Sequence, residues 1–343
     1  MIQSLMKELE FRKKYLKEES VQSIYFGGGT PSILEAEELN QLINKIQSLF
    51  HVEDSCEITL EANPEDLNKN YLQELIDIGI NRLSIGVQSF NEEELKWMNR
   101  AHSSSQSIQS VENASRVGFK NISIDLIYGT KFQTPESWTE TLDKAFQLPI
   151  THLSPYHLTI ENKTTLGHRF KKGVEKEIEE TISEKLFQIL LEKAKQNNFI
   201  HYEISNFGKE GLFSRHNSSY WKGNFYLGIG PGAHSFNGMS RQWNISNNSL
   251  YIKGIEKNEP AFESEFLTET EVFNEFILTG IRTIWGVNSK EIENKFGNKY
   301  YLHLQKKTKP YLEQNLLRIE NEAIVLTEKG KLIADRIASE LFL

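Results

Sequence analysis

Three consecutive glycines, residues 27–29, directly follow the short apolar stretch 23–26. The stretch predicts a strand, and the glycines predict a turn whose main chain a ligand can approach closely, because no Cβ atom blocks it. Thr30 and Pro31 then predict the start of a helix, since proline is favoured in a first helical turn. The alternative is a plain tight turn that binds nothing, because a glycine run alone is a weak motif.

Polar side chains end or interrupt three further apolar stretches. Glu61 ends the stretch 58–61, Gln88 follows Gly86, and Asp125 interrupts an apolar run. A carboxylate can accept charge-assisted hydrogen bonds from an ammonium or a ribose diol, and an amide can both donate and accept. The alternatives are a strand-end residue in water for Glu61 and an internal salt bridge for Asp125.

These positions need a framework that brings strand ends together. Stretches that predict strands lie near residues 22–26, 56–61, 82–87, 121–127, 152–158 and 199–204. Helical patterns lie near residues 2–17, 35–49, 66–78, 91–98, 105–117, 135–146 and 175–196. This alternation predicts an α/β fold with parallel strands, an open or closed barrel that binds ligands at the carboxyl ends of its strands.

The chain begins with a helix and no strand before it. We therefore expect a barrel that lacks its first strand and has an exposed edge near residues 22–26, where a second copy can pair to form a dimer. Residues 1–262 are expected to form this barrel, with an irregular extension over 205–262. Residues 263–343 predict helices, a hairpin around 320–322 and a last helix, which is a winged-helix-like domain.

The composition excludes several classes of protein. The 343 residues carry a formal charge of −8, which disfavours a nucleic-acid binder. No apolar run reaches the roughly 18 residues of a membrane helix, and no secretory signal is present, so we expect a cytoplasmic protein without a transmembrane segment. The single cysteine, Cys56, excludes an intrachain disulfide and predicts a buried, inert thiol.

Five motifs occur in order at the predicted strand ends and in the turn between two of them. They are Tyr-Phe-Gly-Gly-Gly-Thr-Pro (25–31), Glu-Ala-Asn-Pro (61–64), Gly-Val-Gln-Ser (86–89), Arg-Ala-His (100–102) and Asp-Leu-Ile-Tyr-Gly (125–129). In this order the chain resembles, over nearly its whole length, the radical S-adenosylmethionine (SAM) family of the oxygen-independent coproporphyrinogen III oxidase and its relative, the heme chaperone HemW. The resemblance implies a partial (β/α)6 TIM-like barrel with a small C-terminal domain.

The resemblance also implies roles for individual residues. Gly28, Gly29, Thr30 and Glu61 match positions that hold SAM. Gln88, Arg100 and Asp125 match positions that contact a second SAM or shape that part of the pocket. The strand end 154–159 matches another wall of the cavity.

A later segment resembles the chaperone more than the oxidase. Residues 215–221 match its His-Asn-x-x-Tyr-Trp motif with His216, Asn217, Tyr220 and Trp221, and residues 228–235 follow as in the same group. These four residues are candidate heme contacts, because a histidine can ligate heme iron and the aromatic rings can pack on a porphyrin. The alternative is a satisfied loop histidine beside core aromatic residues, and His234 has the same two interpretations.

One family feature is missing. The family places a Cys-x-x-x-Cys-x-x-Cys loop after its first strand to hold a 4Fe-4S cluster. This chain has neither that strand nor that loop. We therefore expect a SAM-binding heme chaperone of this family that delivers heme to hemoproteins and is inactive as a radical enzyme by itself. The alternative is a coproporphyrinogen III oxidase of porphyrin biosynthesis, and a third possibility is another radical SAM reaction. A cluster in the longer family members implies an electron donor as a partner.

Overall fold

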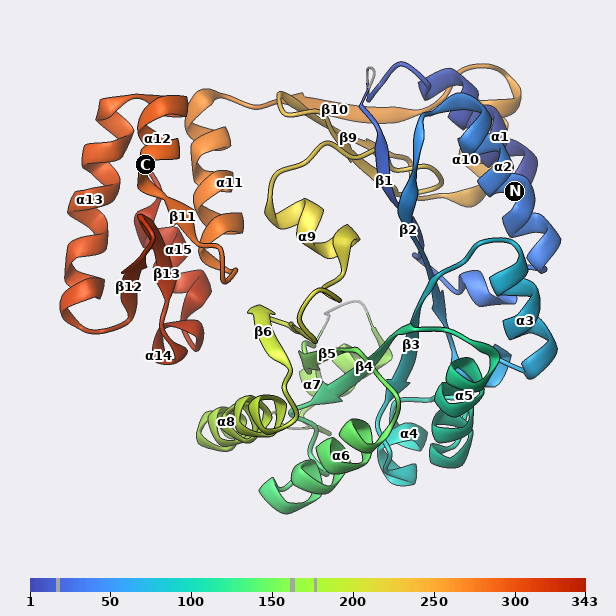
Figure 1. The fold of residues 1–343 in the computed structure, drawn as a ribbon, viewed down its shortest axis with the longest axis horizontal. Coiled ribbons are helices and arrows are strands. Elements are labelled where there is room, and N and C mark those ends of the chain that lie inside the picture. Colours follow the sequence, from blue (N-terminus) through green and yellow to red (C-terminus); the bar gives the residue numbers. More distant parts are fainter. Residues whose placement is uncertain (17–18, 161–163, 176–177) are drawn as a thin grey trace. The chain divides into compact units, whose positions relative to one another are not determined.

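A computed structural model describes residues 1–16, 19–160, 164–175 and 178–343. The chain divides into two compact units (Figure 1). We call Ile24–Ala36 with Glu57–Ser214 the barrel unit, and Met1–Ser23, Glu37–Cys56 and Arg215–Leu343 the composite unit.

The barrel unit contributes most of a curved seven-stranded sheet with the order β1-β2-β3-β4-β5-β7-β6. Its strands are β1 (Val21–Phe26), β2 (Val52–Ala62), β3 (Arg82–Gln88), β4 (Asn121–Tyr128), β5 (His152–His157), β6 (Ile200–Glu203) and β7 (Asn206–Gly208). The pairs from β2 to β5 are parallel, as predicted. The prediction missed β7, which pairs antiparallel with both β5 and β6. The partial α/β barrel is confirmed, and β1 lies at one edge of the sheet.

Helices connect the strands. They are α3 (Lys69–Asp77), α4 (Glu92–Trp97), α5 (Ser104–Val117), α6 (Pro135–Gln147), α7 (Thr165–Lys171) and α8 (Glu180–Gln196). Figure 1 shows α5, α6 and α8 around the outside of the sheet. Capping boxes at Ser103 and Thr134 fix the first turns of α5 and α6, because each side chain satisfies an amide that the helix leaves free. The helix predicted at Pro31 is a single 3-10 turn, Pro31–Ile33.

The two faces of the parallel strands differ sharply. One face is apolar and fully buried, with Leu60, Leu83, Ile85, Ile122, Ile124 and Leu153. The alternate positions are polar, with Thr59, Glu61, Ser84, Ser123, Asp125, His152 and Ser154. Strands of a parallel sheet covered on both faces usually read as continuous apolar runs. The polar face therefore lines the barrel interior, and of the residues named on it only Glu61 and Asp125 are partly exposed to a ligand.

The composite unit holds the remaining elements. They are α1 (Ile2–Arg12), α2 (Ala36–Leu49), α9 (Arg215–Trp221), β8 (His234–Phe236), β9 (Ser240–Asn244), α10 (Asn248–Glu256), β10 (Phe262–Phe266), α11 (Glu269–Ile281), β11 (Val287–Asn288), α12 (Ser289–Phe296), α13 (Asn298–Glu313), β12 (Leu317–Glu320), β13 (Ala323–Leu326), α14 (Glu328–Lys331) and α15 (Ala334–Leu341). The segment 205–262 is less irregular than expected, since β8, β9 and β10 form an antiparallel sheet.

The C-terminal elements follow the predicted order of helices, hairpin and helix. Asn321 and Glu322 both have positive φ angles, 47° and 67°, which joins β12 to β13 in the tight turn that hairpins favour. Thr327 accepts a hydrogen bond from the Gly330 amide at the start of α14, as expected of a cap. Residues 215–262 belong to the same compact unit as 263–343, so the domain boundary after residue 262 stays a prediction.

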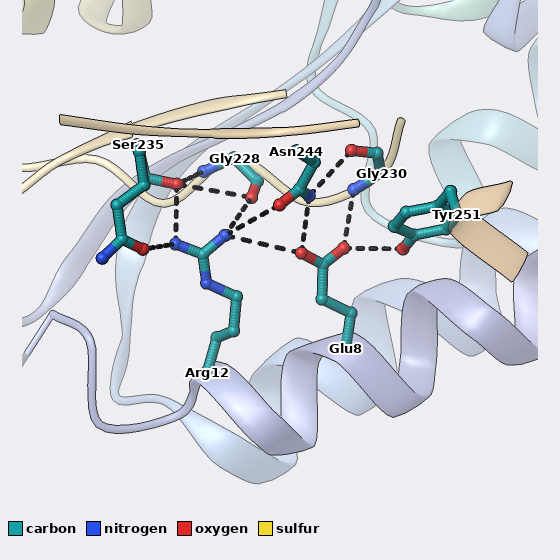
Figure 2. A network of polar contacts seen from close by, with 8 residues as sticks. Glu8, Arg12, Gly228, Gly230, Ser235, Asn244 and Tyr251 are labelled. Atoms are coloured by element: carbon teal, nitrogen blue, oxygen red, sulfur yellow. Dashed lines mark hydrogen bonds and ion pairs between the residues drawn. The ribbon is translucent and has the colours of Figure 1, made fainter. Parts of the chain in front are cut away.

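A buried ion pair anchors α1 (Figure 2). Glu8 and Arg12 are 1% and 8% exposed and lie one helical turn apart. Arg12 donates to Ser235 and to Gln242, while Glu8 accepts from the Gly230 amide and from the groups shown beside it, Asn244 and Tyr251. Side chains of α1 therefore fix the main chain of the glycine-rich segment 228–235, which gives this segment a structural role.

Candidate functional site

The glycine turn after β1 exposes its main chain. Gly28 and Gly29 have φ angles of 71° and 101°, and a Cβ atom built on either would meet nothing within 4 Å. Gly27 differs, since its Cβ atom would lie 2.9 Å from Glu61 Oε1. The turn thus presents bare backbone on one side and abuts a carboxylate on the other, while Thr30 occupies the N-cap position of the following 3-10 turn without a side-chain capping hydrogen bond.

Glu61 is held by a neighbour from β1. The Tyr25 hydroxyl donates a hydrogen bond of 2.5 Å to Glu61 Oε1. Burial, followed by the charge of Glu61, raises the pKa of Tyr25 well above its usual value, so this hydroxyl keeps its proton. Glu61 therefore has a fixed orientation and remains partly exposed.

Asp125 lies on the same polar face. Glu61 is in register with Ser84 on β3, and Asp125 with Ser154 on β5. The Ser84 hydroxyl donates to Asp125 Oδ1 over 3.3 Å. Burial raises the pKa of Asp125 to about 6, and a hydrogen bond from Ser154 opposes the rise.

Gln88 occupies a strained position at the end of β3. Its φ angle is 65°, and the register between β3 and β4 shifts between Ile85 and Gln88. The amide turns back over Gly86, where a Cβ atom would lie 2.9 Å from Gln88 Nε2. Non-glycine residues with positive φ cluster at binding sites, because the surrounding structure must maintain them. Nearby, the buried His102 ring contacts the Val87 carbonyl at 3.1 Å and Glu65 at 3.0 Å, which fixes the strand end.

Arg100 is placed differently from the other candidates. It follows α4, is exposed, and forms no ion pair with any residue in the described ranges. The register thus brings Glu61 and Asp125 onto one face with their serine neighbours, whereas it leaves Arg100 on a surface loop.

A cavity of about 300 Å³ lies in the barrel unit beyond the ends of β4 and β5. Trp97, Gly129, Lys131 and His157 line it, together with residues 158–160. Residues 157–159 of the predicted wall border this cavity, whereas Gly28, Gly29, Glu61 and Asp125 are not among its lining residues. The buried carboxylate of Glu175 holds Lys131 at 2.8 Å beside it.

The second group of candidates lies on α9 in the composite unit. The His216 and Tyr220 rings are 4.9 Å apart edge to face, and Tyr220 meets Tyr226 at 4.6 Å. Trp221 packs under the Arg282 guanidinium at 5.3 Å, while Asn217 is half-buried one turn before it. Tyr220 is 40% exposed and Trp221 is half-buried, so this short helix presents an accessible aromatic ring. His234 is exposed and stacks on Trp243.

Sequence reasoning missed several residues of these groups. Tyr25, Ser84 and Ser154 hold the two carboxylates, and their signal was the alternation of polar and apolar residues along each strand. The helical pattern over residues 2–17 predicts the helix that carries Glu8 and Arg12 but not the burial of their charges. Their four-residue spacing next to Leu9 was the available signal of a buried pair.

The residues present fit SAM and do not fit an iron–sulfur cluster. Gly28 and Gly29 form a cradle that a Cβ atom would fill, and Glu61 and Asp125 supply acceptors near it. The one cysteine, Cys56, is buried, as expected, and the described residues contain no group of three histidine, cysteine or acidic side chains able to hold a metal.

Comparisons with known proteins agree with this architecture. The radical SAM superfamily profile matches residues 5–145, and the HemN C-terminal domain profile matches residues 267–333. The heme chaperone HemW of Lactococcus lactis is 32% identical over 100% of this chain and 89% of its own length. The HemW of Bacillus subtilis is 33% identical over 92% of this chain and 84% of its own.

The fold comparison points the same way. The coproporphyrinogen III oxidase HemN of Escherichia coli superposes with a TM-score of 0.86, covering 99% of this chain and 82% of its own, at 22% identity. The chain belongs to the radical SAM superfamily. Within it, the relatives of 32–33% identity place the chain in the family of HemW. None of the helices formed by the described residues combines the length and apolar composition needed to cross a bilayer.

Proposed function

We propose that this chain binds heme through α9 and passes it to hemoproteins, while the barrel unit binds SAM. The observation that carries the heme part is the pairing of His216 with the accessible ring of Tyr220 on one face of a short helix. Imidazole is a common axial ligand of heme iron, and an aromatic ring beside it packs well against a macrocycle. The HemW relatives are named for the same activity.

In the barrel unit, Gly28, Gly29 and Thr30 hold the polar end of SAM by main-chain groups, and Glu61 accepts a hydrogen bond from its ammonium or ribose. Gln88 and Asp125 line the next part of the pocket, and Arg100 contacts the ligand only if its loop turns inward. When bound, SAM supplies a sulfonium that a reduced cluster can cleave. Cys56 alone cannot hold such a cluster, so the residues of this chain bind and orient SAM without a radical step.

Hemin titration tests the heme part. We expect the Soret band to shift and sharpen as purified protein is added, and the His216→Ala variant to lose that change. His51→Ala is the matched control, because His51 is an exposed histidine of the same unit that directly precedes β2 and is not part of α9. An unchanged Soret band with the unmodified protein contradicts the proposal.

Equilibrium dialysis with radiolabelled SAM tests the barrel part. We expect saturable binding that Glu61→Gln weakens at least tenfold, since a charged acceptor is replaced by a neutral one. Equal retention of SAM by this variant and the unmodified protein would remove Glu61 from the site.

A further inference from the structure

The residue after α9 is a lysine held on an aromatic platform. Lys222 is exposed, and its Nζ atom lies 4.6 Å from the centroid of the Trp285 ring. This contact orients the ammonium without neutralising its charge. Within the described ranges Lys222 forms no ion pair, although acidic residues outnumber basic ones, 47 to 39.

The second cation at this surface is already paired. Arg282 lies over Trp221 at 5.3 Å, but its guanidinium also forms an ion pair with Asp335. Of the two cations that pack on these tryptophans, Lys222 therefore keeps the unshared positive charge. A fixed, unshared ammonium is suited to an anionic ligand group, because little conformational freedom is lost on binding.

Aromatic rings that contact Lys222 or lie close to it in the sequence are accessible. Tyr220, Phe225 and Trp285 are 40%, 39% and 36% exposed, which is unusual for three large aromatic residues close to one helix end. Six residues separate His216 from Lys222, about 9 Å along a helix axis. Lys222 directly follows the last residue of α9, so its ammonium lies at the end of the helix that carries His216.

We propose that Lys222 binds a propionate carboxylate of the macrocycle that α9 receives, so that this surface selects porphyrins by their carboxylates. The inference rests on the proposed heme binding and adds a specificity-determining residue to it. Trp285 acts as a positioning residue, since it contacts the Lys222 ammonium and holds it toward the ligand.

Titration with hemin and with hemin dimethyl ester separates the carboxylate contact of Lys222 from heme binding itself. We expect the unmodified protein to bind hemin about tenfold more tightly than the ester, the effect of one charge-assisted hydrogen bond at a partly exposed site. Lys222→Gln should weaken hemin binding about tenfold and remove this preference, while the Soret maximum of the complex stays unchanged. Lys222→Arg should retain the preference.

Lys295→Gln is the matched control, because Lys295 is also exposed and packs over aromatic rings, those of Phe276 and Phe296. It should bind both ligands as the unmodified protein does. If the unmodified protein binds hemin and the ester equally, or Lys222→Gln keeps the preference, the carboxylate contact is wrong and heme binding stands. If the unmodified protein binds neither ligand, both claims fail.

Discussion

The Tyr25 hydroxyl holds Glu61 across two neighbouring strands with a 2.5 Å hydrogen bond, directly beside the open glycine turn. We expect Tyr25→Phe to weaken SAM binding about three- to tenfold, because Glu61 loses the donor that orients it. Tyr71→Phe is the control, since it removes a hydrogen bond to the Leu34 carbonyl in the same unit. Equal SAM affinity of the two variants in dialysis would contradict a role for Tyr25.

Asp125 should make stability depend on pH. Its pKa of about 6 lies above the value of 3.8 expected for an unfolded chain, so its favourable contribution is full below pH 4 and is lost as the pH rises through 6. Asp125→Asn should therefore be more stable than the unmodified protein at pH 7.5, by about 3 kcal/mol, and the gain should vanish near pH 4.

Urea unfolding between pH 4 and pH 8 measures this difference. Asp54→Asn replaces an exposed aspartate and should show no such trend. A gain from Asp125→Asn that is the same at every pH would show that the carboxyl is not desolvated.

Gly28 offers a test that separates strain from ligand contact. Gly28→Ala and Gly211→Ala both place a Cβ atom in open space on a backbone with φ near 75°. Each should cost about 1–2 kcal/mol of stability, because an L-residue is strained there. Only Gly28→Ala should also reduce SAM affinity, by more than tenfold, since its Cβ atom fills the cradle. Similar SAM binding by both variants would place the ligand elsewhere.

Two glutamate–arginine pairs with the same helical spacing test the anchoring of α1. Glu8 and Arg12 are buried, whereas Glu112 and Arg116 are 41% and 61% exposed. Glu8→Gln should cost about 3–5 kcal/mol, because it leaves the Arg12 charge buried without its partner. Glu112→Gln should cost less than about 1 kcal/mol. Denaturant unfolding compares them, and equal losses would contradict the anchoring.

The sequence was sufficient for the strand–helix alternation of the barrel unit. Each strand carries a strong apolar pattern, and the helices begin at recognisable caps such as Ser103 and Thr134. It was insufficient for β7 and for the sheet formed by β8, β9 and β10, because these strands are short and are held by partners distant in the sequence.

The residues of the candidate site also divide into those that the sequence predicts and those that it does not. Gly28, Glu61 and Asp125 could be selected because a glycine run or an acid at a strand end is unusual locally. Their partners could not, since Tyr25 and Ser84 are ordinary strand residues whose role depends on strand register. The role of Arg100 stays a prediction, because a motif match carries no information about the loop that places this residue, and the loop is exposed.

The anchoring of α1 also sets an order of events during synthesis. Glu8 and Arg12 are synthesised before their hydrogen-bond partners Ser235 and Tyr251, which follow more than 220 residues later. At about 5–20 residues per second, this delay is roughly ten to fifty seconds. Throughout it Glu8 and Arg12 have each other as partners but lack Ser235 and Tyr251, so the anchoring of α1 is completed only after residue 251 has been synthesised.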